Sequence, residues 1–182
     1  MNFYLYRPDA NNFAGIGFSS TDNERIVNVH YTDAVLAHSW IAPVAHAFED
    51  NPEVEGDFPS LSNYNAIPVM SQRAWDVLRP LIRYCCEPLL IIHPAGEPYF
   101  IIHVMETIDC LNADRSEVIR YTDGGIMQVV RYSFRPTMLN GKHIFKLPRE
   151  SGAELIVDDV FRNEVESKGL LGLQLKELPM IE

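Results

Sequence analysis

KHIFKLPRESGAELIVDDVFRNEVESKGLLGLQLKEL, residues 142–178, is the stretch that predicts the fold most directly. His143–Leu147 alternates as a short strand, residues 148–152 form a turn, and Glu154–Val157 is a second apolar run. A third alternation follows further along the chain, at Leu171, Leu173 and Leu175. The stretch therefore predicts two strands joined by a turn and a later strand that returns beside them.

A short helix is expected between the second and third of these strands. Asp158 or Asp159 can accept hydrogen bonds from the free amides at a helix start. Phe161 and Val165 lie four residues apart, so they share one helical face. Gly169 suits the left-handed position after a helix end. Residues 158–168 are thus predicted to form a helix that packs through this apolar face.

The rest of the chain is rich in strands and adds one more principal helix, at residues 71–84. Ser71 is its expected cap, and Pro80 should kink it. The expected strands are Phe3–Tyr6, Arg25–Tyr31, Ile67–Met70, Leu89–His93, Tyr99–Met105, Val118–Tyr121 and Ile126–Phe134. Turn sequences at 94–98 and 123–125 predict hairpins, which favour antiparallel pairing. The fold class is therefore α+β, an antiparallel or mixed sheet with two principal helices packed against it, in a single domain over 1–182.

Residues 33–57 give the weakest structural signal. Irregular structure is expected around Trp40, followed by a short extended piece at Val44–Phe48. Residues 49–57 read EDNPEVEGD, with five acidic side chains and no basic one, which predicts a loop facing water. The loop is either a solvated connection or part of a partner-binding surface. The candidate partner-binding residues in and around it are Tyr31, Trp40, Glu49, Asp50, Glu53, Glu55, Asp57 and Tyr64.

Composition restricts the partner and the compartment. The net charge of −10 repels nucleic acid phosphates and favours a basic protein partner. Three cysteines, two of them adjacent, do not form a disulfide framework, which indicates a reducing compartment. The first residues lack a signal-peptide pattern, and no apolar run approaches the ~20 residues of a membrane span. We therefore expect a cytoplasmic protein without membrane association.

The sequence contains no recognisable catalytic or metal-binding motif. His38 and His46 are eight residues apart across a proline, which is not a standard ligand spacing. Cys110 lies in an apolar context that is typical of an inert thiol. We therefore expect no metal, no cofactor and no catalytic residue. A small-molecule-binding domain or an enzyme that uses a cleft of the sheet remains the alternative.

Several stretches together resemble one family of bacterial immunity proteins, the myxobacterial-type immunity domain family. They read DFP at 57–59, VMS at 69–71, EPYF at 97–100, IDCL at 108–111 and KHIFKL at 142–147. The resemblance covers most of 57–178 and is diffuse over 1–56. It implies that the protein binds and neutralises a cognate toxin, made by the same or a neighbouring cell in a polymorphic toxin system. It transfers no catalytic residue, and residues 10–56 are where we expect partner specificity.

Overall fold

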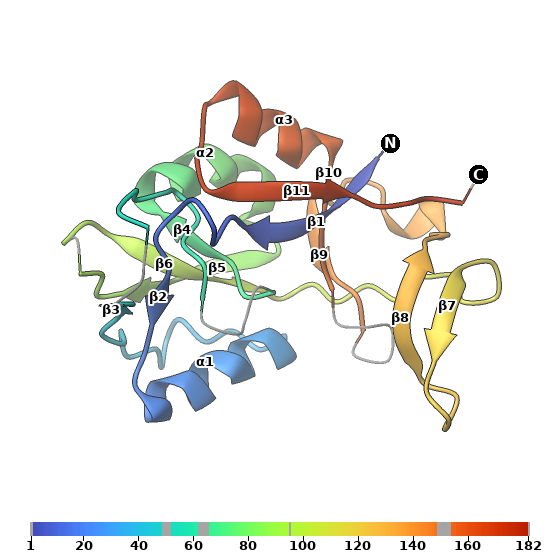
Figure 1. The fold of residues 1–182 in the computed structure, drawn as a ribbon, viewed down its shortest axis with the longest axis horizontal. Helices are drawn as coiled ribbons and strands as arrows, with labels where there is room; N and C mark the ends of the chain where they lie inside the picture. The colour runs from blue at the N-terminus through green and yellow to red at the C-terminus, as the bar shows by residue number, and fades with distance from the viewer. Residues whose placement is uncertain (1, 49–51, 62–65, 95, 149–153, 182) are drawn as a thin grey trace.

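The computed structural model describes residues 2–48, 52–61, 66–94, 96–148 and 154–181. Its largest sheet has the strand order β11 (Leu173–Glu177), β1 (Phe3–Pro8), β10 (Leu155–Asp158) and β9 (Ile144–Lys146), with antiparallel neighbours throughout. The N-terminal strand thus lies between two C-terminal strands, in the centre of the sheet (Figure 1). The two ends of the chain are therefore joined by long-range backbone hydrogen bonds.

The predicted C-terminal unit is confirmed as β9, β10, α3 (Asp159–Ser167) and β11. Asp158 is the N-cap of α3, and its carboxylate accepts from the Phe161 amide at 2.9 Å. Gly169 follows the helix with a φ of +60°, the left-handed region that glycine occupies at no steric cost. Of the turn predicted over 148–152, residues 149–152 lie outside the described part of the chain.

A second sheet has the order β4 (Val69–Ser71), β6 (Tyr99–Val104) and β5 (Cys86–Ile91), again antiparallel. The hairpin predicted across residues 94–98 is the β5–β6 pair. The hairpin predicted across 123–125 is β7 (Glu117–Arg120) with β8 (Ile126–Arg131), followed by a 3-10 turn at Pro136–Met138. Two short strands, β2 (Ile16–Gly17) and β3 (His46–Ala47), form a further pair. The strand-rich α+β fold is therefore confirmed.

Both predicted helices are present, and a third replaces a predicted strand. Ser71 caps α2 (Gln72–Ile82) by accepting from the Ala74 amide at 3.1 Å. The strand expected at Arg25–Tyr31 is wrong, because residues Ser20–Tyr31 form helix α1. Ser19 caps α1, and Ile26 and Val29, three residues apart, form its buried face. The β-branched residues that suggested a strand are compatible with a helix when one face packs on a core.

Three groups of buried side chains form the core. One lies between the large sheet, the second sheet, α2 and α3, and contains Trp75 and Phe161. Another covers the opposite face of the large sheet and includes residues of the β7–β8 hairpin. The third joins α1 to the second sheet, which therefore has α2 on one face and α1 on the other (Figure 1). This arrangement places the chain after α1 along the second sheet, where the candidate residues lie.

Candidate functional site

The structure describes five of the eight predicted partner-binding residues. Glu49, Asp50 and Tyr64 lie outside the described residues. Glu53 and Glu55 are exposed, as expected for the acidic loop. The remaining three described residues, Tyr31, Trp40 and Asp57, differ strongly in exposure. Tyr31 is 58% exposed, Trp40 is half-buried and Asp57 is buried.

Asp57 does not face water, so that part of the acidic-loop prediction is wrong. Its Oδ1 accepts from the Ser71 hydroxyl at 2.7 Å, and its Oδ2 accepts from Arg73 Nη1 and the Leu171 amide, both at 2.9 Å. Burying a carboxylate is costly only when it is unpaired, and here three donors surround it. Asp57 therefore joins the start of α2 to the loop that precedes β11.

Trp40 fixes the segment after α1 against the edge of β5. Its indole N–H donates to the Leu90 carbonyl at 2.8 Å, and the guanidinium of Arg25 lies 4.9 Å from the ring centroid. Further along, the Ile92 amide donates to the Pro43 carbonyl, and the Ala45 amide donates to the Ile92 carbonyl, both at 2.9 Å. Residues 40–45 thus cover an edge that would otherwise offer unpaired backbone groups.

This arrangement exposes an apolar surface that the sequence did not predict. It consists of Trp40, Ile41, Val44, Leu90 and Ile92, and we name it the Trp40 surface. Val44 and Ile92 are partners in a parallel bridge, and Leu90 lies two residues before Ile92, so these three side chains share one side of the edge. Trp40 packs against the third core group and reaches the edge through its bond to the Leu90 carbonyl. Ile41 is 72% exposed, Val44 61%, Ile92 53% and Leu90 46%. The intervening strand residues, Leu89 and Ile91, are buried in the core. Leu90 and Ile92 were missed because an unbroken apolar run predicts a strand that is buried on both faces.

A buried polar network holds the segment that leads to the Trp40 surface. The carboxylate of Glu87 accepts from the amides of Leu36 at 2.6 Å and Ala37 at 3.2 Å. His103 is fully buried, with Nδ1 2.8 Å from Glu87 Oε1 and Nε2 2.8 Å from the Thr32 carbonyl. Burial alone would raise the pKa of Glu87, but hydrogen bonds from His103 and the two amides outweigh it and lower the pKa. Both ring nitrogens of His103 contact oxygen atoms, so the ring links β6 to Glu87 on β5 and to the backbone at the end of α1.

Lys146 supports the same segment from the large sheet. It is only 3% exposed, and its ammonium donates to the carbonyls of His30 at 2.9 Å and Thr32 at 3.3 Å. A third bond reaches Asp33 Oδ1 at 3.1 Å. Lys146 can donate three hydrogen bonds, and these contacts supply three acceptors. The segment beyond α1 is therefore preorganised, which reduces the entropy that binding a partner would cost.

Negative charge lies at one end of the Trp40 surface. The pKa of Tyr99 is raised to about 12, first by burial and then by the charges of Glu55, Asp57 and Glu97. His93, which stacks on Tyr99 with ring centroids 4.1 Å apart, directly follows Ile92. Glu55 and Glu97 are exposed. An acidic rim thus adjoins the apolar surface and would attract a basic partner.

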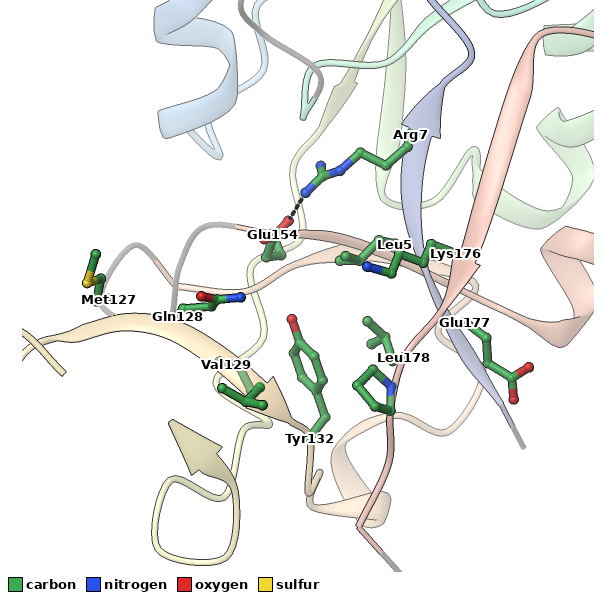
Figure 2. A pocket seen from close by; sticks show the side chains of 12 residues that line it. Leu5, Arg7, Met127, Gln128, Val129, Tyr132, Glu154, Lys176, Glu177 and Leu178 are labelled. Atoms are coloured by element: carbon green, nitrogen blue, oxygen red, sulfur yellow. Dashed lines mark hydrogen bonds and ion pairs between the residues drawn. The ribbon is translucent and has the colours of Figure 1, made fainter. Parts of the chain in front are cut away.

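A groove of about 370 Å³ lies elsewhere, between β8 and one face of the large sheet (Figure 2). An ion pair between Arg7 and Glu154, 2.8 Å long, crosses its lining. The hydroxyl of Tyr132 points into the groove toward Glu154. Burial, followed by the charge of Glu154, raises the pKa of Tyr132 to about 12, so its hydroxyl stays protonated and can donate. This groove is the kind of cleft that the alternative, small-molecule function requires.

Neither surface has a recognisable catalytic arrangement. Burial raises the pKa of the Cys110 thiol to about 12, which opposes formation of a nucleophilic thiolate. Across the described ranges, no group of three or more histidine, cysteine and acidic residues is placed to hold a metal ion. In the same part of the chain, every helix is too short or too polar to cross a membrane. The geometry of both surfaces supports binding.

Comparison with known proteins agrees with the resemblance seen in the sequence. A search of curated proteins finds no significant match. The family model of the immunity protein family (Imm11), however, matches residues 43–179, which is most of the chain and all of β3 to β11. The match includes Ile92 and the C-terminal unit, but it begins after Trp40. On this match, the chain belongs to the Imm11 immunity protein family.

Proposed function

We propose that this protein neutralises a cognate bacterial toxin by direct, stoichiometric binding, and that the Trp40 surface is the centre of the interface. Membership of an immunity protein family supports the toxin as partner. The observation that carries the interface is the exposed apolar cluster held on a preorganised segment. Large exposed apolar patches on monomeric proteins commonly mark interaction sites. The toxin would act in the cytoplasm, and the immunity protein would meet it there.

The Trp40 surface has the composition of an interface centre. Protein interfaces draw most of their affinity from a few buried aromatic and apolar anchors surrounded by a rim that excludes water. Trp40 is already fixed by its bond to Leu90, so little side-chain entropy remains to be lost when a partner covers it. A stable interface buries about 800 Å² per partner, so neighbouring side chains must contribute as well. Tyr31, 58% exposed at the end of α1, is our candidate for this role.

The acidic residues would act mainly on the rate of association. With a net charge of −10 and exposed carboxylates beside the apolar surface, the protein would attract a basic toxin face over a distance. Charges at an interface rim change the association rate more than the dissociation rate. Changing Glu49, Asp50, Glu53 and Glu55 together to amides should therefore slow association and weaken its salt dependence, measured by stopped-flow fluorescence. An unchanged association rate at low salt would mean that this loop is only a solvated connection.

Coexpression with a candidate toxin, taken from a gene adjacent to that of this chain, tests the proposed function. Wild-type protein should restore growth and co-purify with the toxin. Ile41→Asp places a charge at the most exposed position of the Trp40 surface and should weaken binding at least about tenfold. Ile119→Asp is the matched control, because Ile119 is 47% exposed on the separate β7–β8 hairpin. Equal binding by both variants would remove the Trp40 surface from the interface, and failure of the wild type to protect would refute the function.

A further inference from the structure

We propose that the groove between β8 and the large sheet binds an extended acidic peptide segment, which adds as a strand along the free edge of β8. This site is separate from the Trp40 surface, and the proposal does not depend on the toxin. β8 supplies four consecutive residues to the groove, 127–130. Successive side chains of a strand point to opposite faces of the sheet. Four consecutive residues can therefore line the same groove when the groove runs along the edge of the strand. Among the described residues, β8 pairs along 126–131 with β7 alone.

The protein already adds a strand beside the end of β8, at one end of the groove, where Tyr132 and Pro179 belong to the lining. The Tyr132 amide donates to the Pro179 carbonyl at 2.8 Å, and the Ile181 amide donates to the Tyr132 carbonyl at 2.7 Å. Tyr132 and Met180 thus form a parallel bridge where the C-terminal segment runs beside the end of β8. The groove opens where β11 separates from β8 to pair with β1. An extended peptide placed there would continue a pairing that the chain has begun, which is how peptides add to exposed sheet edges.

The side chains on the groove floor favour a carboxylate on this peptide. Arg7 and Leu5 are two residues apart on β1, and Lys176 is the direct partner of Leu5 on β11, so all three share one face. Glu154 occupies one edge of the Arg7 guanidinium, which has further N–H groups to donate. Glu177 directs its carboxylate away from the groove (Figure 2). The lining holds two cations and two carboxylates, but Glu154 is paired with Arg7 and Glu177 points away (Figure 2), so Lys176 and the remaining N–H groups of Arg7 are left to bind a carboxylate.

The remaining lining residues limit the size of the bound peptide and the order of its side chains. The volume of about 370 Å³ lies in the lower range of ligand sites and admits a short stretch of backbone with its side chains. The protonated Tyr132 hydroxyl adds a neutral donor near Arg7, and the exposed Met127 and half-buried Leu5 provide apolar contacts. An alternation of acidic and β-branched apolar residues would place carboxylates on the cationic floor and apolar groups away from it.

Binding of synthetic peptides to the full chain tests this proposal. The probe is a fluorescently labelled hexapeptide of alternating valine and glutamate with blocked ends, and anisotropy measures its affinity. The matched probe replaces glutamate with lysine and should bind at least about tenfold more weakly. Its ammonium groups would be repelled by Arg7 and Lys176 and could not accept their hydrogen bonds. A third probe carries N-methyl groups on alternate residues, which remove the donors that strand pairing needs. It should lose binding even though its charge is unchanged.

Variants of the protein locate the site. Lys176→Glu should weaken the acidic peptide about tenfold, and Tyr132→Phe should weaken it by a smaller factor, because it removes one neutral donor. Arg115→Glu is the control, since Arg115 is exposed and lies outside the groove. Thermal melts establish that each variant is folded. Equal affinity for the acidic and basic peptides, full binding of the N-methylated peptide, or equal loss in Lys176→Glu and Arg115→Glu would overturn the proposal. So would no binding of the acidic peptide to the wild type.

Discussion

Glu87 should stabilise both the fold and the segment that presents the Trp40 surface. Glu87→Gln keeps the size of the side chain but removes its negative charge. It also leaves one oxygen in place of two to contact His103 and the amides of Leu36 and Ala37. Hydrogen bonds to charged groups contribute about 1.5–3 kcal/mol each. Because glutamine retains one carbonyl acceptor, we expect the free energy of unfolding to fall by about 2–4 kcal/mol at pH 7.

The pH dependence separates this effect from a loss of packing. The pKa of Glu87 is lowered in the folded protein from an ordinary value of 4.5. The stabilisation from its charge is therefore complete above the unfolded pKa and is lost as the pH falls through the folded pKa. In urea melts, the difference between wild type and Glu87→Gln should be constant from pH 7 to pH 5 and should narrow at lower pH. Glu97→Gln, at an exposed position on the β5–β6 turn, should change stability by less than about 0.5 kcal/mol. A Glu87→Gln variant as stable as wild type, or a difference that does not narrow in acid, would refute this account.

Two further changes test the core and the buried carboxylate. Trp75 and Phe161 anchor α2 and α3 in one cluster, so truncating either to alanine should cost about 3–5 kcal/mol in urea melts, and a cost below about 1 kcal/mol would contradict their role. Asp57→Asn should cost about 1–3 kcal/mol, because an amide cannot accept from all three donors now on the carboxylate, whereas unchanged stability would show that Asp57 does not join α2 to the loop before β11.

Local sequence signals predicted the elements whose causes are local. Ser71 and Asp158 are caps in the structure, and both hairpins lie where their turn residues placed them. Ile26 and Val29 led to the wrong prediction of a strand, because β-branched residues are enriched in strands. Their packing against distant core residues, which the sequence does not show, stabilises the helix instead. The insertion of β1 between β10 and β11 joins residues more than 150 positions apart, and no local pattern encodes that pairing.

The candidate surface shows the same division between local and long-range causes. Trp40 was recognised as an aromatic candidate, but Leu90 and Ile92 join it only because residues 40–45 pair with the edge of β5. Asp57 was predicted to face water with the other acidic loop residues. Its three donors come from the start of α2 and the loop before β11, which are distant in sequence. The buried contacts of Glu87, His103 and Lys146 with residues 30–37 depend on strands from two different sheets. Charge composition predicts an acidic surface, whereas only the fold determines which apolar residues lie beside it.

Titration of purified toxin with this protein distinguishes stoichiometric binding from catalytic inactivation. Toxin activity and the mass of the complex would be measured together as the immunity protein is added. Stoichiometric binding predicts that inhibition is complete at an equimolar ratio, that complex formation follows the loss of activity, and that Ile41→Asp shifts both curves while Ile119→Asp shifts neither. Complete and lasting inhibition by a small fraction of an equivalent, without a stable complex, would mean that the protein inactivates its target catalytically and not by stoichiometric binding.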